Sequence, residues 1–166
     1  MESTLIALVE DKPGVLNRVA SLFRRRAFNI ESLTVGHTEH PGVSRMTIVV
    51  DSKRTDVRKV AQNLYKLVNV IQVEDVTERP AVMRDLALIR VRANGGGNRS
   101  EVMQIVDTFR ARVVDVSIDT LMIEATGTEE KVDGLVEVLR PFGILEMVRT
   151  GRVAMVRGGD GNNRKS

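Results

Sequence analysis

The residues best placed to bind a ligand form a short turn, residues 10–16, with the sequence EDKPGVL. Pro13 suits the first turn of a helix because its missing N–H would have no partner there, and Gly14 lets a ligand approach the backbone. The free N–H groups and the positive end of the helix dipole would attract a small carboxylate. Spacing alone still favours an ordinary turn between a strand and a helix.

No other group of side chains suggests catalysis or metal binding. His37 and His40 flank a turn with Glu39, where a solvated turn is a better reading than a metal site because no further ligands are evident. The run Gly95-Gly96-Gly97 lies where phosphate loops lie, but the Lys-Ser/Thr pair that should end such a loop is missing. A flexible turn is expected there. We therefore predict no catalytic residues and no metal site.

Composition is that of a soluble globular protein. The chain has 166 residues, of which 42% are hydrophobic and 28% charged, and no apolar run approaches a membrane span. The absence of cysteine excludes disulfides, thiol catalysis and thiolate metal sites. Nothing at the N-terminus marks the chain for export, so a cytoplasmic protein is expected.

The net charge is only +3, with basic residues concentrated at Arg24-Arg25-Arg26 and in the tail. Cations in the last turn of a helix complement its dipole, and this reading is preferred to a nucleic-acid patch. Aromatic residues make up 3% of the chain, too few for a sheet that stacks bases. We expect no binding to nucleic acid or to membranes.

The first half alternates strand-like and helix-like segments in a recognisable order. Apolar, β-branched runs predict strands at residues 4–9, 29–38, 43–50 and 70–76. Apolar residues at helical spacing, such as Val15, Val19 and Leu22, predict a helix over residues 14–26, and a second stripe predicts one over 53–68. This is the ferredoxin-like βαββαβ plan, in which the sheet face opposite the helices stays open or serves association.

The same plan repeats after Pro80, which interrupts the apolar pattern. Strands are expected at residues 86–91, 112–118, 120–126 and 144–149, with a short extension at 153–156. One helix should begin at Ser100 and another after the cap Thr128. We predict an α+β chain of two ferredoxin-like domains in tandem, residues 1–78 and 84–157, with a linker at 79–83 and a disordered tail at 158–166.

Several runs resemble one known family. Residues 11–16 (DKPGVL) are similar to the ligand turn of ACT domains, the amino-acid-sensing modules of many biosynthetic enzymes. Residues 29–36 (NIESLTVG) and 44–47 (SRMT) resemble one ACT family, the regulatory small subunit of acetolactate synthase, also called acetohydroxyacid synthase. Residues 84–89 (RDLALI), 109–111 (FRA), 114–116 (VDV) and 149–151 (RTG) match it too. The resemblance covers all but the last few residues.

In that family the effector lies between the turn before the first helix and the second strand, at a dimer interface. Carried over by position, the resemblance implies an effector site of Asp11, Gly14, Val15, Leu16, Asn29 and Ile30. Backbone N–H groups of residues 14–16 would bind the ligand carboxylate, and Asn29 could bridge its two polar ends. Several members have asparagine where this chain has Asp11, and a simple turn or helix-start anion is an equally good reading of that residue.

The resemblance implies a non-catalytic regulatory subunit in branched-chain amino-acid biosynthesis. It would bind valine, activate a separate catalytic large subunit and confer feedback inhibition. Thiamine diphosphate, magnesium and FAD would belong to that transferase partner, and this chain would hold no cofactor. It would form homodimers or larger homo-oligomers with sheets joined edge to edge. Two alternatives stay open: a free-standing amino-acid-binding ACT regulator, and a ferredoxin-like nucleic-acid-binding module.

Overall fold

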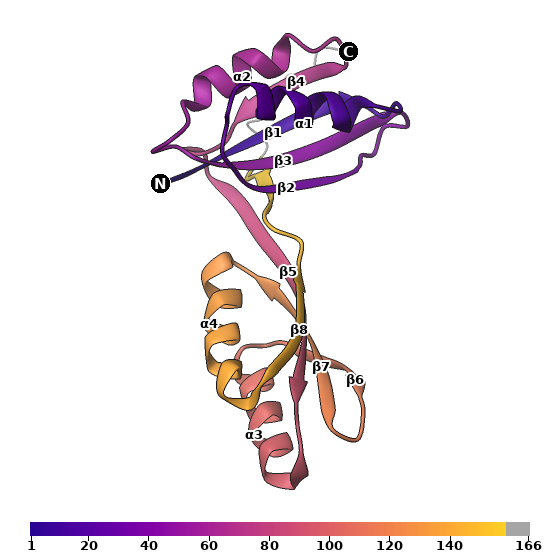
Figure 1. Ribbon diagram of the computed structural model, residues 1–166, viewed down its shortest axis with the longest axis vertical. Helices are drawn as coiled ribbons and strands as arrows, with labels where there is room; N and C mark the ends of the chain where they lie inside the picture. Colours follow the sequence, from indigo (N-terminus) through magenta and orange to yellow (C-terminus); the bar gives the residue numbers. More distant parts are fainter. Residues whose placement is uncertain (159–166) are drawn as a thin grey trace. The chain divides into compact units, whose positions relative to one another are not determined.

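The computed structural model describes residues 1–158, which form two compact units (Figure 1). The first unit contains Met1–Val82 and the chain from Arg152 onward, and the second contains Met83–Gly151. All but the first residue of the tail predicted at 158–166 lies outside the described residues. Within residues 1–158, no helix is both long enough and apolar enough to cross a membrane.

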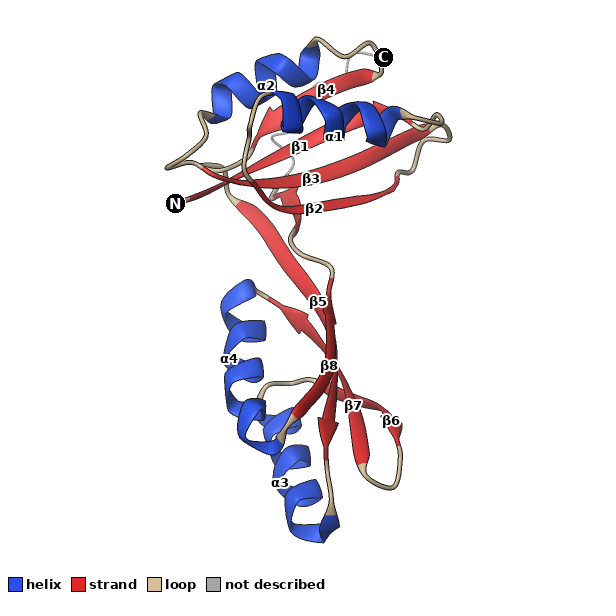
Figure 2. Cartoon of the chain, viewed as in Figure 1, coloured by secondary structure: helices blue, strands red, loops and turns tan. Residues whose placement is uncertain are grey.

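The first unit has the predicted βαββαβ order. Its elements are β1 (Glu2–Glu10), α1 (Val15–Arg25), β2 (Ile30–His37), β3 (Val43–Asp51), α2 (Val57–Tyr65) and β4 (Val70–Asp75). The strands lie in the order β2-β3-β1-β4, with antiparallel neighbours. Both helices cover one face of this sheet (Figure 2). The ferredoxin-like prediction is confirmed for this half.

A single apolar core joins the sheet to the two helices. Leu5, Ala7 and Val9 occupy alternate positions of β1 that face the helices, and they meet Val19 of α1 and Leu64 of α2. All five are at most 1% exposed. Complete burial of one such aliphatic side chain stabilises a fold by about 1.5–3 kcal/mol, so these contacts hold α1 and α2 against the sheet.

The opposite face of this sheet is covered within the chain itself, whereas from sequence we expect a face that stays open or serves association. Ile6, Thr47 and Val49, which point away from the helices, are 4%, 3% and 2% exposed. The covering segment is β9 (Val153–Val156), which pairs with β5 (Ala81–Arg92). A local pattern could predict the short strand but not its place, because its partners lie far away in the sequence.

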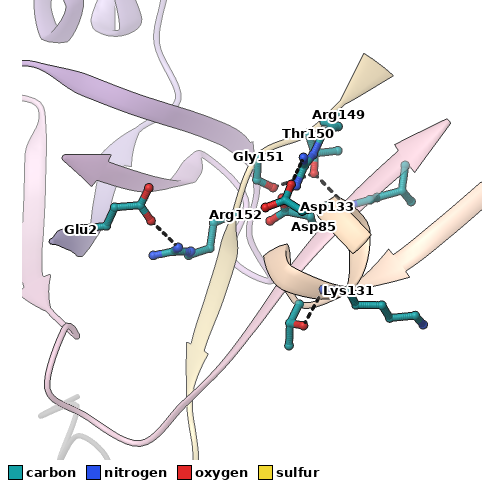
Figure 3. Close-up of polar contacts among 10 residues, drawn as sticks. Glu2, Asp85, Lys131, Asp133, Arg149, Thr150, Gly151 and Arg152 are labelled. Atoms are coloured by element: carbon teal, nitrogen blue, oxygen red, sulfur yellow. Dashed lines mark hydrogen bonds and ion pairs between the residues drawn. The ribbon is translucent and has the colours of Figure 1, made fainter. Parts of the chain in front are cut away.

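Two arginines attach β9 to the first sheet. Arg45 of β3 donates a 2.7 Å hydrogen bond to the carbonyl of Ala154. Arg152 donates a 2.9 Å bond to the hydroxyl of Thr4. It also forms an ion pair with Glu2 at 2.6 Å, which Figure 3 shows. Residues 152–157, which we assigned from sequence to the second domain, therefore belong to the first unit.

The second unit repeats the topology of the first. After β5 come α3 (Gly95–Thr108), β6 (Arg112–Val116), β7 (Thr120–Gly127), α4 (Glu129–Leu139), a 3-10 turn (Arg140–Phe142) and β8 (Ile144–Arg149). The strands lie in the order β6-β7-β5-β8, which is the order of the first sheet with each strand number raised by four. Thr128 caps α4 as predicted, accepting a hydrogen bond from the N–H of Lys131. The tandem ferredoxin-like fold is confirmed.

A buried ion-pair network closes the second sheet onto α4 (Figure 3). Arg149 of β8 lies 2.8 Å from Asp85, whose side chain is 6% exposed, and 2.6 Å from Asp133 of α4. Burial alone would lower the pKa of Arg149, but the hydrogen bonds to Asp133 and Asp85 outweigh it and raise that pKa. The guanidinium thus compensates a carboxylate that would otherwise be buried without a partner.

Several boundaries differ from the sequence-based predictions. Strand β5 starts at Ala81, inside the stretch predicted as a linker at 79–83. Helix α3 starts at Gly95, so the three glycines form its first turn and not a flexible loop. Helix α2 starts four residues later than predicted, because residues 53–55 form a turn on Asp51 and Asp56 then caps the helix through the N–H of Arg58.

Candidate effector-binding site

The ligand turn lies between the end of β1 at Glu10 and the start of α1 at Val15. Gly14 is the N-cap residue of α1 and has a φ of 84°, a left-handed conformation that glycine adopts without strain. A Cβ built on Gly14 would meet no atom within 4 Å, so the space beside it is open. The N–H of Asp11 donates to the carbonyl of Gly42 at 2.9 Å, which holds the turn against the β2–β3 hairpin.

The N-terminus of α1 offers backbone donors to an anion. The N–H of Val15 makes a long, 3.3 Å bond to the carbonyl of Lys12, and the regular helical bonds begin with Arg18 donating to Gly14. No side chain caps this helix, and its first turn has no acidic residue. Uncapped N–H groups at the positive end of a helix dipole bind a carboxylate well.

Polar side chains outside the predicted set support the turn. Glu10 lies 2.9 Å from the Lys12 ammonium and accepts a 3.1 Å bond from the amide of Asn69, which in turn accepts one from Arg18. Hydrogen bonds from Lys12 and Asn69 lower the pKa of Glu10. Asn69 is 8% exposed. Sequence reasoning missed Arg18 and Asn69, because nothing in the local pattern connects residues 51 positions apart.

The end of β2 also reaches the turn. Nδ1 of His37 lies 3.4 Å from a carboxylate oxygen of Asp11, and the two side chains are 86% and 47% exposed. His40 instead lies 3.6 Å from Glu39 in the hairpin. Within residues 1–158, no three histidine, aspartate or glutamate side chains gather as a metal site would require. His37 therefore joins the candidate site as a neighbour of Asp11.

Four of the six predicted site residues surround the turn in one chain. Asp11, Gly14 and Leu16 are exposed there, and 48% of the Leu16 surface is accessible. Val15 is only 4% exposed and packs in the core, so it can offer a ligand its backbone but not its side chain. Leu16 is the apolar side chain that a bound amino acid could contact.

Asn29 and Ile30 lie at the other end of the sheet. Ile30 pairs with Val50, whereas Glu10 pairs with Val43 on the same strand. Seven residues along β3 separate these positions, roughly 23 Å at about 3.3 Å per residue. The amide of Asn29 donates to Glu31 at 2.9 Å. A single chain therefore does not bring these two residues to the ligand turn.

Comparison with known proteins gives consistent matches over both units. Residues 5–72 match a family model described as an AHAS small subunit-like ACT domain, and residues 84–158 match one described as the small subunit of acetolactate synthase. The chain is 53% identical to a probable acetolactate synthase small subunit of Archaeoglobus fulgidus, over 95% of this chain and 98% of that one. It is also 53% identical to the acetolactate synthase small subunit of Mycobacterium leprae, over 93% and 91%.

A solved structure agrees with these matches. The acetolactate synthase small subunit of Thermotoga maritima superposes with a TM-score of 0.88 at 40% identity. The superposition covers 96% of this chain and 99% of that one, so the similarity includes both units and is not confined to one ACT module.

Proposed function

Because the chain belongs to the family of acetolactate synthase small subunits, we propose that it is the non-catalytic regulatory subunit of such an enzyme. It raises the activity of a separate catalytic large subunit and makes that activity sensitive to valine. The large subunit holds thiamine diphosphate, magnesium and FAD, and it carries out the reaction. The feature that carries the valine assignment is the uncapped N-terminus of α1, which follows Gly14.

The turn matches the two charged groups of a free amino acid. The α-carboxylate of valine binds the N–H groups at the start of α1, in place of a side-chain cap. Asp11 is an exposed carboxylate beside this position and suits the ammonium group. Leu16 and Val35, 48% and 42% exposed, offer apolar contacts to the isopropyl group.

A two-fold dimer would complete the site. Strand β2 is an edge strand of its sheet, and an edge strand can pair with a strand of another chain. If two copies pair β2 with β2 in antiparallel fashion, the start of the partner's strand comes beside the end of this one, where His37 contacts Asp11. Asn29 and Ile30, at the start of β2, then reach the ligand turn of the other copy.

The same geometry explains how binding could be communicated. A ligand held between two copies binds the paired state more tightly than the separated one, and this difference shifts the population toward the pair. Coupling between sites in allosteric proteins is typically about 1–3 kcal/mol, a 5- to 150-fold change in affinity. One interfacial ligand contact per copy suffices for an effect of this size.

The test of the regulatory role is a mixing experiment without valine. Acetolactate formation from pyruvate is measured for this chain alone, for the cognate large subunit alone and for both together. We expect no product from this chain alone and a higher turnover for the mixture than for the large subunit. Product formed by this chain alone, or equal rates with and without it, would show that the proposal is wrong.

A further inference from the structure

Strand β4 is the second edge of the first sheet, on the opposite side from β2. It runs beside α2 (Figure 1). An edge strand can pair with a strand of another chain, because backbone N–H and C=O groups point outward from it at every second residue. A sheet that pairs at both edges can associate without limit, since each pair formed at one edge leaves the other edge of both copies free. The groups at the β4 edge therefore decide whether association through this sheet stops at a pair.

The register of β4 against β1 shows which backbone groups face outward. The N–H of Val76 donates to the carbonyl of Thr4 at 3.0 Å, so Thr4 directs its backbone groups toward the β4 side. Bonding groups alternate along an antiparallel pair, so Ile6 does the same two residues later and bonds to Glu74, its partner in the register. Val73 is the neighbour of Glu74 in β4. The N–H and C=O of Val73 consequently point away from β1, toward the outer side of the edge.

Both outward groups of Val73 bond to one side chain. The hydroxyl of Tyr65, the last residue of α2, accepts a 2.9 Å bond from the N–H of Val73 and donates a 3.0 Å bond to its carbonyl. One hydroxyl can do both, because it has a donor and two acceptor lone pairs. Tyr65 is 53% exposed, so water could satisfy all of these groups and burial does not explain the contact. The side chain occupies the position that the backbone of an added strand would take.

Apolar side chains beside this contact would make an open edge prone to association. Ile71, two residues before Val73, is 52% exposed, and Val68 is 91% exposed. The start of β4, residues 70–73 (VIQV), carries no charge, although charged side chains are a common protection of strand edges. Exposed apolar residues along an uncharged edge are typical of segments that pair with their own copies. The bonds of Tyr65 supply a protection that this part of the strand otherwise lacks.

We propose that Tyr65 closes the β4 edge, so that copies of this chain do not pair through β4 and their strand-to-strand association is directed to the β2 edge. The proposal rests on the proposed function only in naming β2 as the edge that pairs. Closure of β4 depends on the two bonds between Tyr65 and Val73, and it requires neither valine nor the large subunit. Tyr65 thus limits the size of the assembly.

The experiment removes this hydroxyl from the full chain. Tyr65→Phe keeps the aromatic ring and frees both backbone groups of Val73. Sedimentation velocity over a wide range of protein concentration compares the variant with the wild type. We expect species of larger mass in Tyr65→Phe, in a share that rises with concentration, as growth through a second edge requires. Tyr65→Met also removes the hydroxyl and repeats the comparison if Tyr65→Phe does not fold.

Two glutamate substitutions locate the new contact. Ile71→Glu adds a negative charge to a strand that already carries Glu74 and Asp75, so facing copies of β4 would repel each other. In the Tyr65→Phe background, it should restore the masses of the wild type. Val114→Glu is the matched control, because Val114 is an aliphatic strand residue of the second unit with 47% exposure. It should leave the larger species in place. Circular dichroism checks that each variant is folded.

Hydrogen exchange of the Val73 amide tests the contact itself. The single variant Ile71→Glu is compared with the double variant Ile71→Glu/Tyr65→Phe, since neither should pair through β4. Loss of the hydroxyl should accelerate exchange at Val73 roughly 2- to 10-fold, as the loss of a typical hydrogen bond predicts. The amide of Glu74, which faces β1, should exchange at the same rate in both.

Several results would overturn the proposal. Equal masses in the wild type and Tyr65→Phe would show that the hydroxyl does not close the edge. Larger species that survive Ile71→Glu, or that Val114→Glu removes to the same extent, would place the new contact outside β4. An unchanged exchange rate at Val73 would show that Tyr65 does not protect this amide. If copies do not pair through β2, the proposed dimer fails, while the results at β4 still decide the role of Tyr65.

Discussion

At the scale of single residues, the candidate site depends on the backbone of Gly14. Its φ of 84° directs the chain out of β1 and into α1 without a side chain over the first N–H groups. Serine, threonine, aspartate and asparagine are the usual residues at such a position because they cap these groups. A glycine there leaves the donors free for a ligand.

Gly14→Asp should therefore weaken valine binding. The new carboxylate would cap the N–H groups and repel the ligand, and loss of one charge-assisted bond alone costs about 1.5–3 kcal/mol, or roughly 10- to 150-fold in affinity. The positive φ adds about 1 kcal/mol of strain for a side chain, partly offset by the new cap. Calorimetry with valine measures the affinity, and urea unfolding measures the stability.

Gly95→Asp is the matched control for Gly14→Asp. Gly95 also has a positive φ, 79°, with open space around its Cβ position, but it lies in the second unit. This variant should show a comparable loss of stability and an unchanged affinity for valine. An unchanged affinity in a folded Gly14→Asp variant would mean that the turn does not hold the ligand.

At the scale of elements, the Arg149 network should decide the stability of the second unit. Arg149→Met leaves the Asp85 carboxylate buried without a partner, and breaking a buried pair in this way costs about 3 kcal/mol or more. Asp133→Ala removes a carboxylate with 55% side-chain exposure and should cost less than about 1 kcal/mol. Urea unfolding followed by circular dichroism measures both.

The double variant Arg149→Met/Asp85→Leu tests the reason for this difference. It removes both charges from the buried position, so it should regain most of the stability lost in Arg149→Met. Equal losses in Arg149→Met and Asp133→Ala would show that burial of Asp85 is not the cause.

Strand β9 gives the second prediction at this scale. A chain ended after Gly151 lacks the segment that covers Ile6, Thr47 and Val49. Exposure of two buried aliphatic side chains costs about 3 kcal/mol or more and leaves an apolar face. We expect a lower unfolding temperature and concentration-dependent aggregation, measured by scanning calorimetry and light scattering.

Arg45→Met serves as the milder comparison, because it removes one bond to β9 and keeps the strand. The unfolding temperature of Arg45→Met should lie between that of the wild type and that of the shortened chain. For the same reason, a fragment of residues 1–78 lacks a covered second face and should be less stable than the whole first unit. A shortened chain as stable and monodisperse as the full one would contradict this role of β9.

Much of the fold could be predicted from the sequence, because its signals are local. Apolar periodicity predicts the order of strands and helices in both halves, and the cap Thr128 predicts the start of α4. The predictions failed where distant partners decide. Helix α3 begins at Gly95 despite the low helix propensity of glycine, and its Arg99 donates to the carbonyls of Ser117 and Ile118. Strand β9 pairs with β5, which lies far from it in the sequence. Likewise, the sequence predicted the ligand turn but not Arg18 and Asn69, whose hydrogen bond supports it.

At the scale of the whole molecule, the proposed site needs two copies. Asn29 and Ile30 lie too far from the ligand turn of their own chain, and in the proposed dimer the pairing of β2 edges brings them to the turn of the other copy. The chain has no cysteine, which makes introduced cysteines unambiguous reporters of that pairing.

Single cysteines at Ser32, Thr34 and Gly36 should locate the two-fold axis. In an antiparallel pair, only positions close to the axis lie opposite their own copies, within the roughly 4–7 Å that a disulfide spans between Cα atoms. We expect one of the three to form a cross-linked dimer rapidly under mild oxidation, seen by non-reducing electrophoresis. Gly158→Cys, outside the sheets, is the control. No faster cross-linking from β2 than from position 158 would argue against the edge-to-edge dimer.

The central claim is that this chain makes a catalytic subunit responsive to valine through the turn at Gly14. The most direct test is a valine titration of acetolactate formation by the large subunit, alone and reconstituted with this chain. We expect a saturable inhibition curve that appears only in the reconstituted enzyme. A reconstituted enzyme that is activated but follows the same valine curve as the large subunit alone would contradict it.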